Sequence, residues 1–146
     1  MKEKEEFSQH FREVQPKFAR LCVRSLSEAN LTMPQFAMLN VLAGAGPIPM
    51  TDLSDKLHIT KPAVTNLVDR LEKNKYLKRL PHAEDRRIHL IQIEPKGKKL
   101  VQGMQSTILG FLLKALELFD ASERKTVTEF YARLSKTMDD FLTKKK

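Results

Sequence analysis

Side chains suited to reading a nucleic acid are concentrated between Thr60 and Lys75. At 3.6 residues per turn, four apolar residues share one helical face and are expected to point inward: Val64, Leu67, Val68 and Leu71. The opposite face, with Ala63 and Thr65 at its edges, carries small, polar and basic residues: Lys61, Pro62, Asn66, Asp69, Arg70 and Lys73. Short polar side chains can approach base edges in the major groove, while a helix N-terminus and an ammonium group attract phosphate.

A second basic feature is the pair Arg86 and Arg87, which ends a polar segment beginning at Pro81. The runs on either side, Tyr76–Leu80 and Ile88–Ile93, alternate like strands, so the polar segment is expected to be the tip of a β-hairpin. An arginine at such a tip suits the narrow minor groove, where the negative potential is enhanced. Taken separately, this tip also fits a merely solvated turn, and the helical face also fits a merely solvated helix side.

Asp69 is the awkward member of the polar face, because DNA phosphates repel a carboxylate. Three interpretations are open for it. It forms an ion pair with Arg70, it forms an ion pair with an arginine of the hairpin, or it accepts a hydrogen bond from a cytosine amino group.

The elements that would present these residues follow one another directly. A short helix is expected from about Thr51 to Leu57, then a tight link at His58 and Ile59, then a second helix capped by Thr60 and running to about Lys75. Two helices joined by about three residues form a helix-turn-helix, and a hairpin placed directly after it is a wing.

Amphipathic helices are expected on both sides of this unit. The first has a stripe at spacings of four and three, with a kink or restart at Pro16: Phe7, Phe11, Val14, Phe18 and Leu21. Thr32 and Gln35 predict a capping box that opens the next helix. Apolar stripes that no other part of the same chain buries predict a two-fold homodimer with a helical core.

The C-terminal part is expected to begin with a turn at Pro95 and Gly97, followed by a long helix from Lys98. Asp120 is expected to cap a last helix. The fold class is therefore mainly α with a small β-hairpin wing. We expect a single domain, with a winged helix-turn-helix part over 31–97 and helical dimerisation parts over 1–30 and 98–146.

The charge balance is consistent with a polyanionic partner. The 146 residues include 26 Lys and Arg against 18 Asp and Glu, a formal net charge of +8. The charged N-terminus lacks the apolar core of a signal peptide, and the longest uncharged stretch, 31–51, is broken by prolines and glycines. We therefore expect a cytoplasmic protein that has no membrane partner.

Catalytic and metal-binding patterns are missing from the sequence. There is no glycine-rich phosphate loop, no helical pair of histidines flanking a glutamate, and no nucleophile elbow, so we expect neither an enzyme nor a cofactor. Cys22 is the only cysteine and is expected to be a small buried apolar residue. The four histidines are scattered, so no metal site is expected, although His82 and His89 could approach each other across the hairpin.

The segment from Leu31 to Gly97 resembles the MarR family of regulators. Four stretches carry the resemblance: Leu31–Phe36, Asp52–Leu57, Ile59–Glu72 and the wing signature Asp85-Arg86-Arg87. After the wing, the family usually has Leu-Thr-x-x-Gly, whereas this chain has Ile93-Glu94-Pro95-Lys96-Gly97. Pro95 can still start a helix, so the fold is expected to be kept, although the junction between the wing and the following helix is expected to differ.

The resemblance implies a dimeric transcription regulator, usually a repressor, on palindromic duplex operators. It implies that Thr60–Lys75 enters the major groove, that Arg87 enters the minor groove with Asp85 orienting it by an ion pair, and that Arg86 meets phosphate. It also implies release by a small effector, often an anionic phenolic compound, whose binding residues the sequence does not identify. The alternative is a winged-helix module that binds proteins and not DNA, since a fold does not determine a function.

Overall fold

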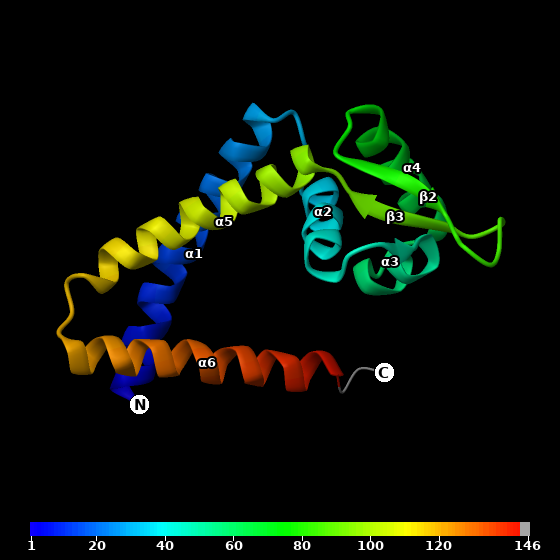
Figure 1. The fold of residues 1–146 in the computed structure, drawn as a ribbon. Coiled ribbons are helices and arrows are strands. Elements are labelled where there is room, and N and C mark those ends of the chain that lie inside the picture. The colour runs from blue at the N-terminus through cyan, green and yellow to red at the C-terminus, as the bar shows by residue number, and fades with distance from the viewer. Residues whose placement is uncertain (144–146) are drawn as a thin grey trace. The chain divides into compact units, whose positions relative to one another are not determined.

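The computed structural model describes residues 1–143, which form six helices and a three-stranded antiparallel sheet (Figure 1). The elements in chain order are α1 (Lys2–Glu28), α2 (Met33–Ala45), β1 (Ile48–Pro49), α3 (Met50–Leu57), α4 (Lys61–Lys73), β2 (Leu77–Pro81), β3 (His89–Ile93), α5 (Pro95–Leu116) and α6 (Ala121–Thr143). The chain forms two compact units, Met1–Ile108 and Leu109–Lys146, and the helix α5 runs through the boundary. No helix within residues 1–143 has both the length and the hydropathy needed to cross a membrane.

The first unit is built around an aliphatic core to which every helix from α1 to α5 and the sheet contribute. Its fully buried side chains include Met38, Leu39 and Leu42 of α2, Leu53 of α3, and Ile91 of β3. Each buried aliphatic side chain of this size contributes about 1.5–3 kcal/mol to folding. This core fixes the directions of α3, α4 and the sheet relative to one another.

Helix α1 continues through Pro16 as a single element, so the expected alternative of a restart at Pro16 is wrong. A proline inside a helix removes one backbone hydrogen bond. Pro16 is exposed, so water can donate a hydrogen bond to the carbonyl oxygen that lacks its N–H partner. Only Leu26 of this helix is buried, while Cys22 is half-buried against the core.

Helix α2 begins as the sequence predicts. The Thr32 side chain accepts a hydrogen bond from the backbone N–H of Gln35 (3.5 Å), and the Gln35 side chain accepts one from the backbone N–H of Thr32 (2.8 Å). This reciprocal capping box confirms the predicted helix start. The helix ends at Ala45, before Gly46 with its φ of 72°.

The sheet has one strand more than the predicted hairpin. Strand β1, only two residues long, pairs with β3 through Ile48 opposite Ile91, so β3 is central and the strand order is β1-β3-β2. Strands β2 and β3 each begin one residue later than expected, at Leu77 and His89. Tyr76 is therefore a buried residue just before the strand.

The predicted turn at Pro95 and Gly97 is wrong, since both residues lie in the first turn of α5. Proline is favoured in a first helical turn, where its missing N–H has no partner to lose. A Cβ on Gly97 would lie 2.4 Å from the Tyr76 carbonyl oxygen and 2.8 Å from Cγ1 of Ile93. Gly97 is thus explained by close packing between the start of α5 and the sheet.

The second unit pairs the end of α5 with α6. Asp120 caps α6 as predicted, because its Oδ1 accepts the Glu123 N–H while a Glu123 carboxylate oxygen accepts the Asp120 N–H, both at 2.9 Å. None of the α6 residues within Ala121–Thr143 is buried. The helix nevertheless carries apolar residues at alternating spacings of four and three: Val127, Tyr131, Leu134, Met138 and Phe141.

Replacing Gly97 with alanine is expected to lower the free energy of unfolding by about 1–3 kcal/mol, because the added methyl group meets backbone that cannot move aside. Urea denaturation followed by circular dichroism measures the change. Gly44→Ala is the matched control, since a Cβ added to Gly44 in α2 would have nothing within 4 Å, and alanine is the better helix former. Equal stability of Gly97→Ala and the control would contradict the close packing.

Candidate nucleic-acid interface

The turn between α3 and α4 sets the direction of the second helix. The Ser54 hydroxyl donates a hydrogen bond to the Ile59 carbonyl (2.8 Å), and His58 adopts the left-handed conformation at φ 52°. Thr60 then caps α4, its side chain accepting the backbone N–H of Ala63 at 3.3 Å. The predicted helix-turn-helix is confirmed, although α4 ends at Lys73 rather than Lys75, whose φ of 61° is left-handed.

Helix α4 buries the face that its periodicity predicts. Val64, Val68 and Leu71 are buried, and Leu67 is half-buried against the core. The residues of this segment that are predicted to contact DNA lie on the other side, where Ala63 is half-buried and the rest are exposed: Thr60, Lys61, Pro62, Thr65, Asn66, Asp69, Arg70 and Lys73. The structure therefore brings this whole set onto one accessible surface, which we call the α4 face.

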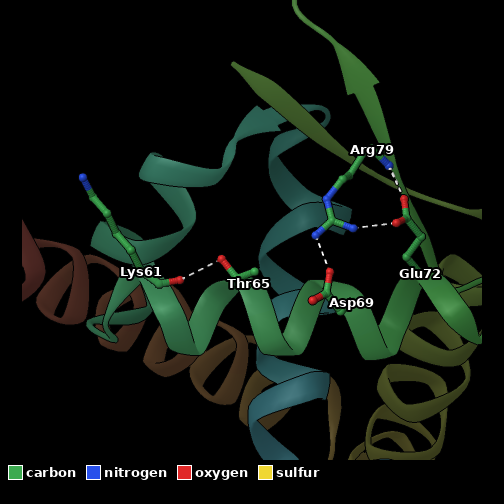
Figure 2. Close-up of polar contacts among 5 residues, drawn as sticks. All are labelled: Lys61, Thr65, Asp69, Glu72 and Arg79. Atoms are coloured by element: carbon green, nitrogen blue, oxygen red, sulfur yellow. Dashed lines mark hydrogen bonds and ion pairs between the residues drawn. The ribbon is translucent and has the colours of Figure 1, made fainter. Parts of the chain in front are cut away.

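The basic and amide side chains of the α4 face are available to bind a ligand. Within residues 1–143, the side chains of Lys61, Asn66, Arg70 and Lys73 have no hydrogen-bond or ion-pair partner. The Thr65 hydroxyl donates to the Lys61 carbonyl (3.1 Å), which leaves its lone pairs free to accept (Figure 2). These groups can meet phosphates and base edges without first breaking an internal contact.

Asp69 is the exception, and of the interpretations left open for it the structure shows an ion pair with an arginine of the hairpin. Its carboxylate pairs with Nη2 of Arg79, on the hairpin strand β2, at 2.5 Å (Figure 2). The same guanidinium donates to Glu72 through Nη1, also at 2.5 Å, and the Arg79 backbone N–H donates to the other Glu72 oxygen at 2.9 Å. Asp69 thus pairs with an arginine of the hairpin, but the arginine is not at the tip.

Arg79 is a site residue that sequence reasoning missed. Partial burial opposes its charge, yet the hydrogen bonds to Asp69 and Glu72 prevail and raise the pKa of its guanidinium above the ordinary value. Its side chain is 24% exposed, in contrast to the wing arginines. The alternation of β2 places Arg79 on the same face as the buried Leu77, which was the signal available in the sequence.

The loop between β2 and β3 is the predicted wing, and it extends beyond the ends of both strands (Figure 1). Asp85 Oδ1 accepts the backbone N–H of Arg87 at 2.9 Å and lies 3.3 Å from its Nε, so the orienting contact exists. The Arg87 side chain is nevertheless 92% exposed, and Arg86 is exposed beside it. Both arginines are therefore presented outward.

His82 builds the turn that carries these arginines. Its Nδ1 accepts the backbone N–H groups of Glu84 (3.2 Å) and Asp85 (3.3 Å), and the His82 backbone N–H donates to the Ile88 carbonyl (3.2 Å). Within residues 1–143 no three His, Cys, Asp or Glu side chains are grouped as metal ligands.

The junction after the wing also has its own chemistry. Glu94, at the place of the threonine usual in the family, forms an ion pair with Lys78 (3.5 Å), and its backbone N–H donates to the Tyr76 carbonyl (2.9 Å). The Lys96 ammonium lies 4.3 Å from the centre of the Tyr76 ring and donates to the Asn74 carbonyl (3.0 Å). The departure from the family pattern is thus accommodated without loss of the element order.

Comparison with known proteins gives consistent matches. The family model described as MarR family matches residues 31–89. YfiV of Bacillus subtilis, an uncharacterized HTH-type transcriptional regulator, is 31% identical over 111 residues, which are 76% of this chain and 69% of YfiV.

Solved structures agree. The transcriptional regulator Tm0710 of Thermotoga maritima superimposes with a TM-score of 0.75 at 25% identity, covering 95% of this chain and 98% of that one. A mutant of S. aureus MepR, bound to an oligodeoxyribonucleotide, has the same fold, with a TM-score of 0.70 at 24% identity over 92% of this chain and 97% of that one. With its capped second helix, its arginine-bearing wing and these relatives, the chain belongs to the MarR family of transcriptional regulators.

Proposed function

We propose that this regulator binds a palindromic duplex operator as a homodimer and represses transcription from it. The observation that carries the proposal is the α4 face, an accessible surface of uncommitted polar and basic side chains at the capped end of a helix. Its residues would lie in the major groove, where short side chains meet base edges and the helix N-terminus meets phosphate. The protein would act in the cytoplasm and has no proposed enzymatic role.

The wing would make the second contact. Arg87, oriented by Asp85, would enter the minor groove beside the major groove occupied by α4, and Arg86 would bind phosphate. The similar MepR mutant is bound to an oligodeoxyribonucleotide, which supports this use of the shared fold.

The dimer would be formed by the terminal helices, in keeping with the proposed division into a DNA-binding part over 31–97 and dimerisation parts on either side. Helix α1 exposes Phe11 and Val14, and helix α6 exposes Leu134 and Met138, each more than a third. Exposed apolar stripes of this length are typical of surfaces that a partner covers. Two copies would then hold two α4 helices for the two halves of a palindrome.

A small anionic effector is a further part of the proposal. A cavity of about 420 Å³ in the first unit is lined by Tyr76, Met104 and the two basic residues Lys96 and Lys99, among others. An aromatic ring and ammonium groups beside an apolar wall suit an aromatic anion. Release of the bound duplex on addition of an anionic phenol tests this part, and no release across a panel of such compounds would remove it.

Charge reversal on the interface tests DNA binding. The triple variant Lys61→Glu, Arg70→Glu, Arg86→Glu is expected to bind a duplex, selected from a random library by the wild-type chain, at least about 100-fold more weakly near 0.1 M salt. Fluorescence anisotropy measures the affinity and its salt dependence.

The matched control reverses three exposed lysines of α1, Lys2, Lys4 and Lys17, and so changes the net charge equally. Because α1 is part of the proposed dimer, sedimentation velocity must first show that this control is still a dimer. A loss in the control as large as in the interface variant would mean that only net charge matters. If neither the wild type nor the variant bound any duplex, the protein-binding alternative would be favoured.

The dimer is tested on α6. Leu134→Asp is expected to raise the dimer dissociation constant at least about tenfold. In the proposed dimer, a carboxylate would be buried at a position where the leucine makes an apolar contact. Sedimentation velocity measures the change, with Ser135→Asp as the control on the adjacent exposed position. A wild-type chain that is monomeric at micromolar concentration would contradict the proposal outright.

The wing turn is tested at His82. His82→Leu removes the acceptor for two backbone N–H groups, so the wing loop is expected to be less ordered in the free protein. Ordering this loop on DNA would then cost free energy, and the affinity is expected to fall by about two- to tenfold. His82→Asn keeps a short side-chain acceptor of the kind that forms such turns and is expected to bind like the wild type. Equal affinity of the leucine and asparagine variants for the selected duplex would show that the turn does not matter for binding.

A further inference from the structure

The three hydrogen bonds between Arg79 and helix α4 form one connection, which we call the Arg79 bridge and define by Arg79, Asp69 and Glu72 (Figure 2). Glu72 is held at both carboxylate oxygens, one by the guanidinium and one by the backbone of β2. A planar guanidinium that donates to two carboxylates at once is fixed in orientation as well as in distance. The bridge therefore holds the hairpin strand against the helix in one register.

The bridge lies between the two groups proposed to contact DNA. Lys61, Thr65 and Asp69 follow one another at spacings of four along α4, so the bridge begins on the same side of the helix as part of the α4 face (Figure 2). On the hairpin side, Arg79 pairs with Ile91 of β3, two residue pairs before the last pair, Pro81 with His89. The wing loop begins directly after that pair.

The bridge also determines the charge that the α4 face presents. Asp69 lies on the α4 face and the half-buried Glu72 lies one turn further along the helix, so without Arg79 two unpaired carboxylates would repel nearby phosphates. Arg79 pairs with both, and a guanidinium stays charged at neutral pH. With its guanidinium committed in this way, Arg79 is poorly placed to contact DNA itself.

The neighbouring residue on the same strand shows what a purely local ion pair looks like. Lys78 points to the other side of β2 and pairs with Glu94, which lies next to β3 and not on α4. Lys78 and Arg79 thus carry the same charge one residue apart, but of these two side chains only Arg79 connects the hairpin to α4.

We infer that Arg79 is a positioning residue for operator binding: it connects the wing to α4, so that Arg87 reaches the minor groove at a fixed distance from the bases that α4 contacts. The inference rests on the proposed function. It predicts that the benefit of Arg87 depends on the bridge, which a role in stability alone would not produce.

A double-mutant cycle tests this dependence. The background is Asp69→Asn, Glu72→Gln, Arg79→Met, which removes the bridge and leaves no unpaired carboxylate. Arg87→Ala is measured in the wild type and in this background, on the duplex selected by the wild type. It is expected to weaken wild-type binding about tenfold or more, but binding in the background less than about threefold.

The matched control repeats the cycle with Lys78→Met, where Arg87→Ala is expected to keep its full effect. Circular dichroism at the assay temperature shows that each chain is folded. If the triple variant does not fold, Arg79→Lys replaces it, since one ammonium cannot hold both carboxylates in the same planar arrangement.

An equal effect of Arg87→Ala with and without the bridge would overturn the inference while leaving DNA binding intact. A smaller effect in the Lys78→Met background as well would also overturn it, because removing either basic side chain of β2 would then suffice. A wild-type chain that selects no duplex would overturn the proposed function, and the inference with it.

Discussion

The burial of one aliphatic face of α4 is the interaction on which the rest of the structure depends. Val64, Val68 and Leu71 pack into the same core as Leu53 of α3 and Ile91 of β3. The three side chains lie along one side of the helix, so they determine its rotation as well as its position. Any large rotation of α4 about its axis would expose aliphatic surface and bury charged groups, both of which are costly. The polar face is accessible because the aliphatic face on the opposite side of α4 must be buried.

Features encoded within a few residues were predictable. The capping boxes at Thr32 and Asp120, the cap at Thr60 and the inward face of α4 follow from local hydrogen bonding and helical period. Strand β1 could not be predicted, because two residues are too few to show alternation and their pairing depends on β3, which is distant in the sequence. The pairing of Arg79 with both Asp69 and Glu72 could not be predicted for the same reason, since it joins a helix to a strand across a chain reversal.

Two expectations that failed concern proline and glycine: a restart of the helix at Pro16, and a turn at Pro95 and Gly97 before the helix. Pro16 lies on an exposed part of α1, where losing one backbone hydrogen bond is tolerated, and Pro95 occupies a first turn that needs no donor. Gly97 owes its place to the Tyr76 carbonyl, a neighbour from before the hairpin that has no signature in the local sequence. In each case the tertiary surroundings decided what a conformationally special residue does.

A mechanical consequence follows from the shortness of the link between sheet and helix. Only Glu94 separates the last residue of β3 from the first residue of α5. Its own backbone is restricted because a proline follows, and that proline has a fixed φ. The link therefore has almost no torsional slack with which to absorb a change of direction. A tilt in the first turns of α5 would be passed on to the central strand, and from it to the hairpin, whereas a longer loop would absorb it.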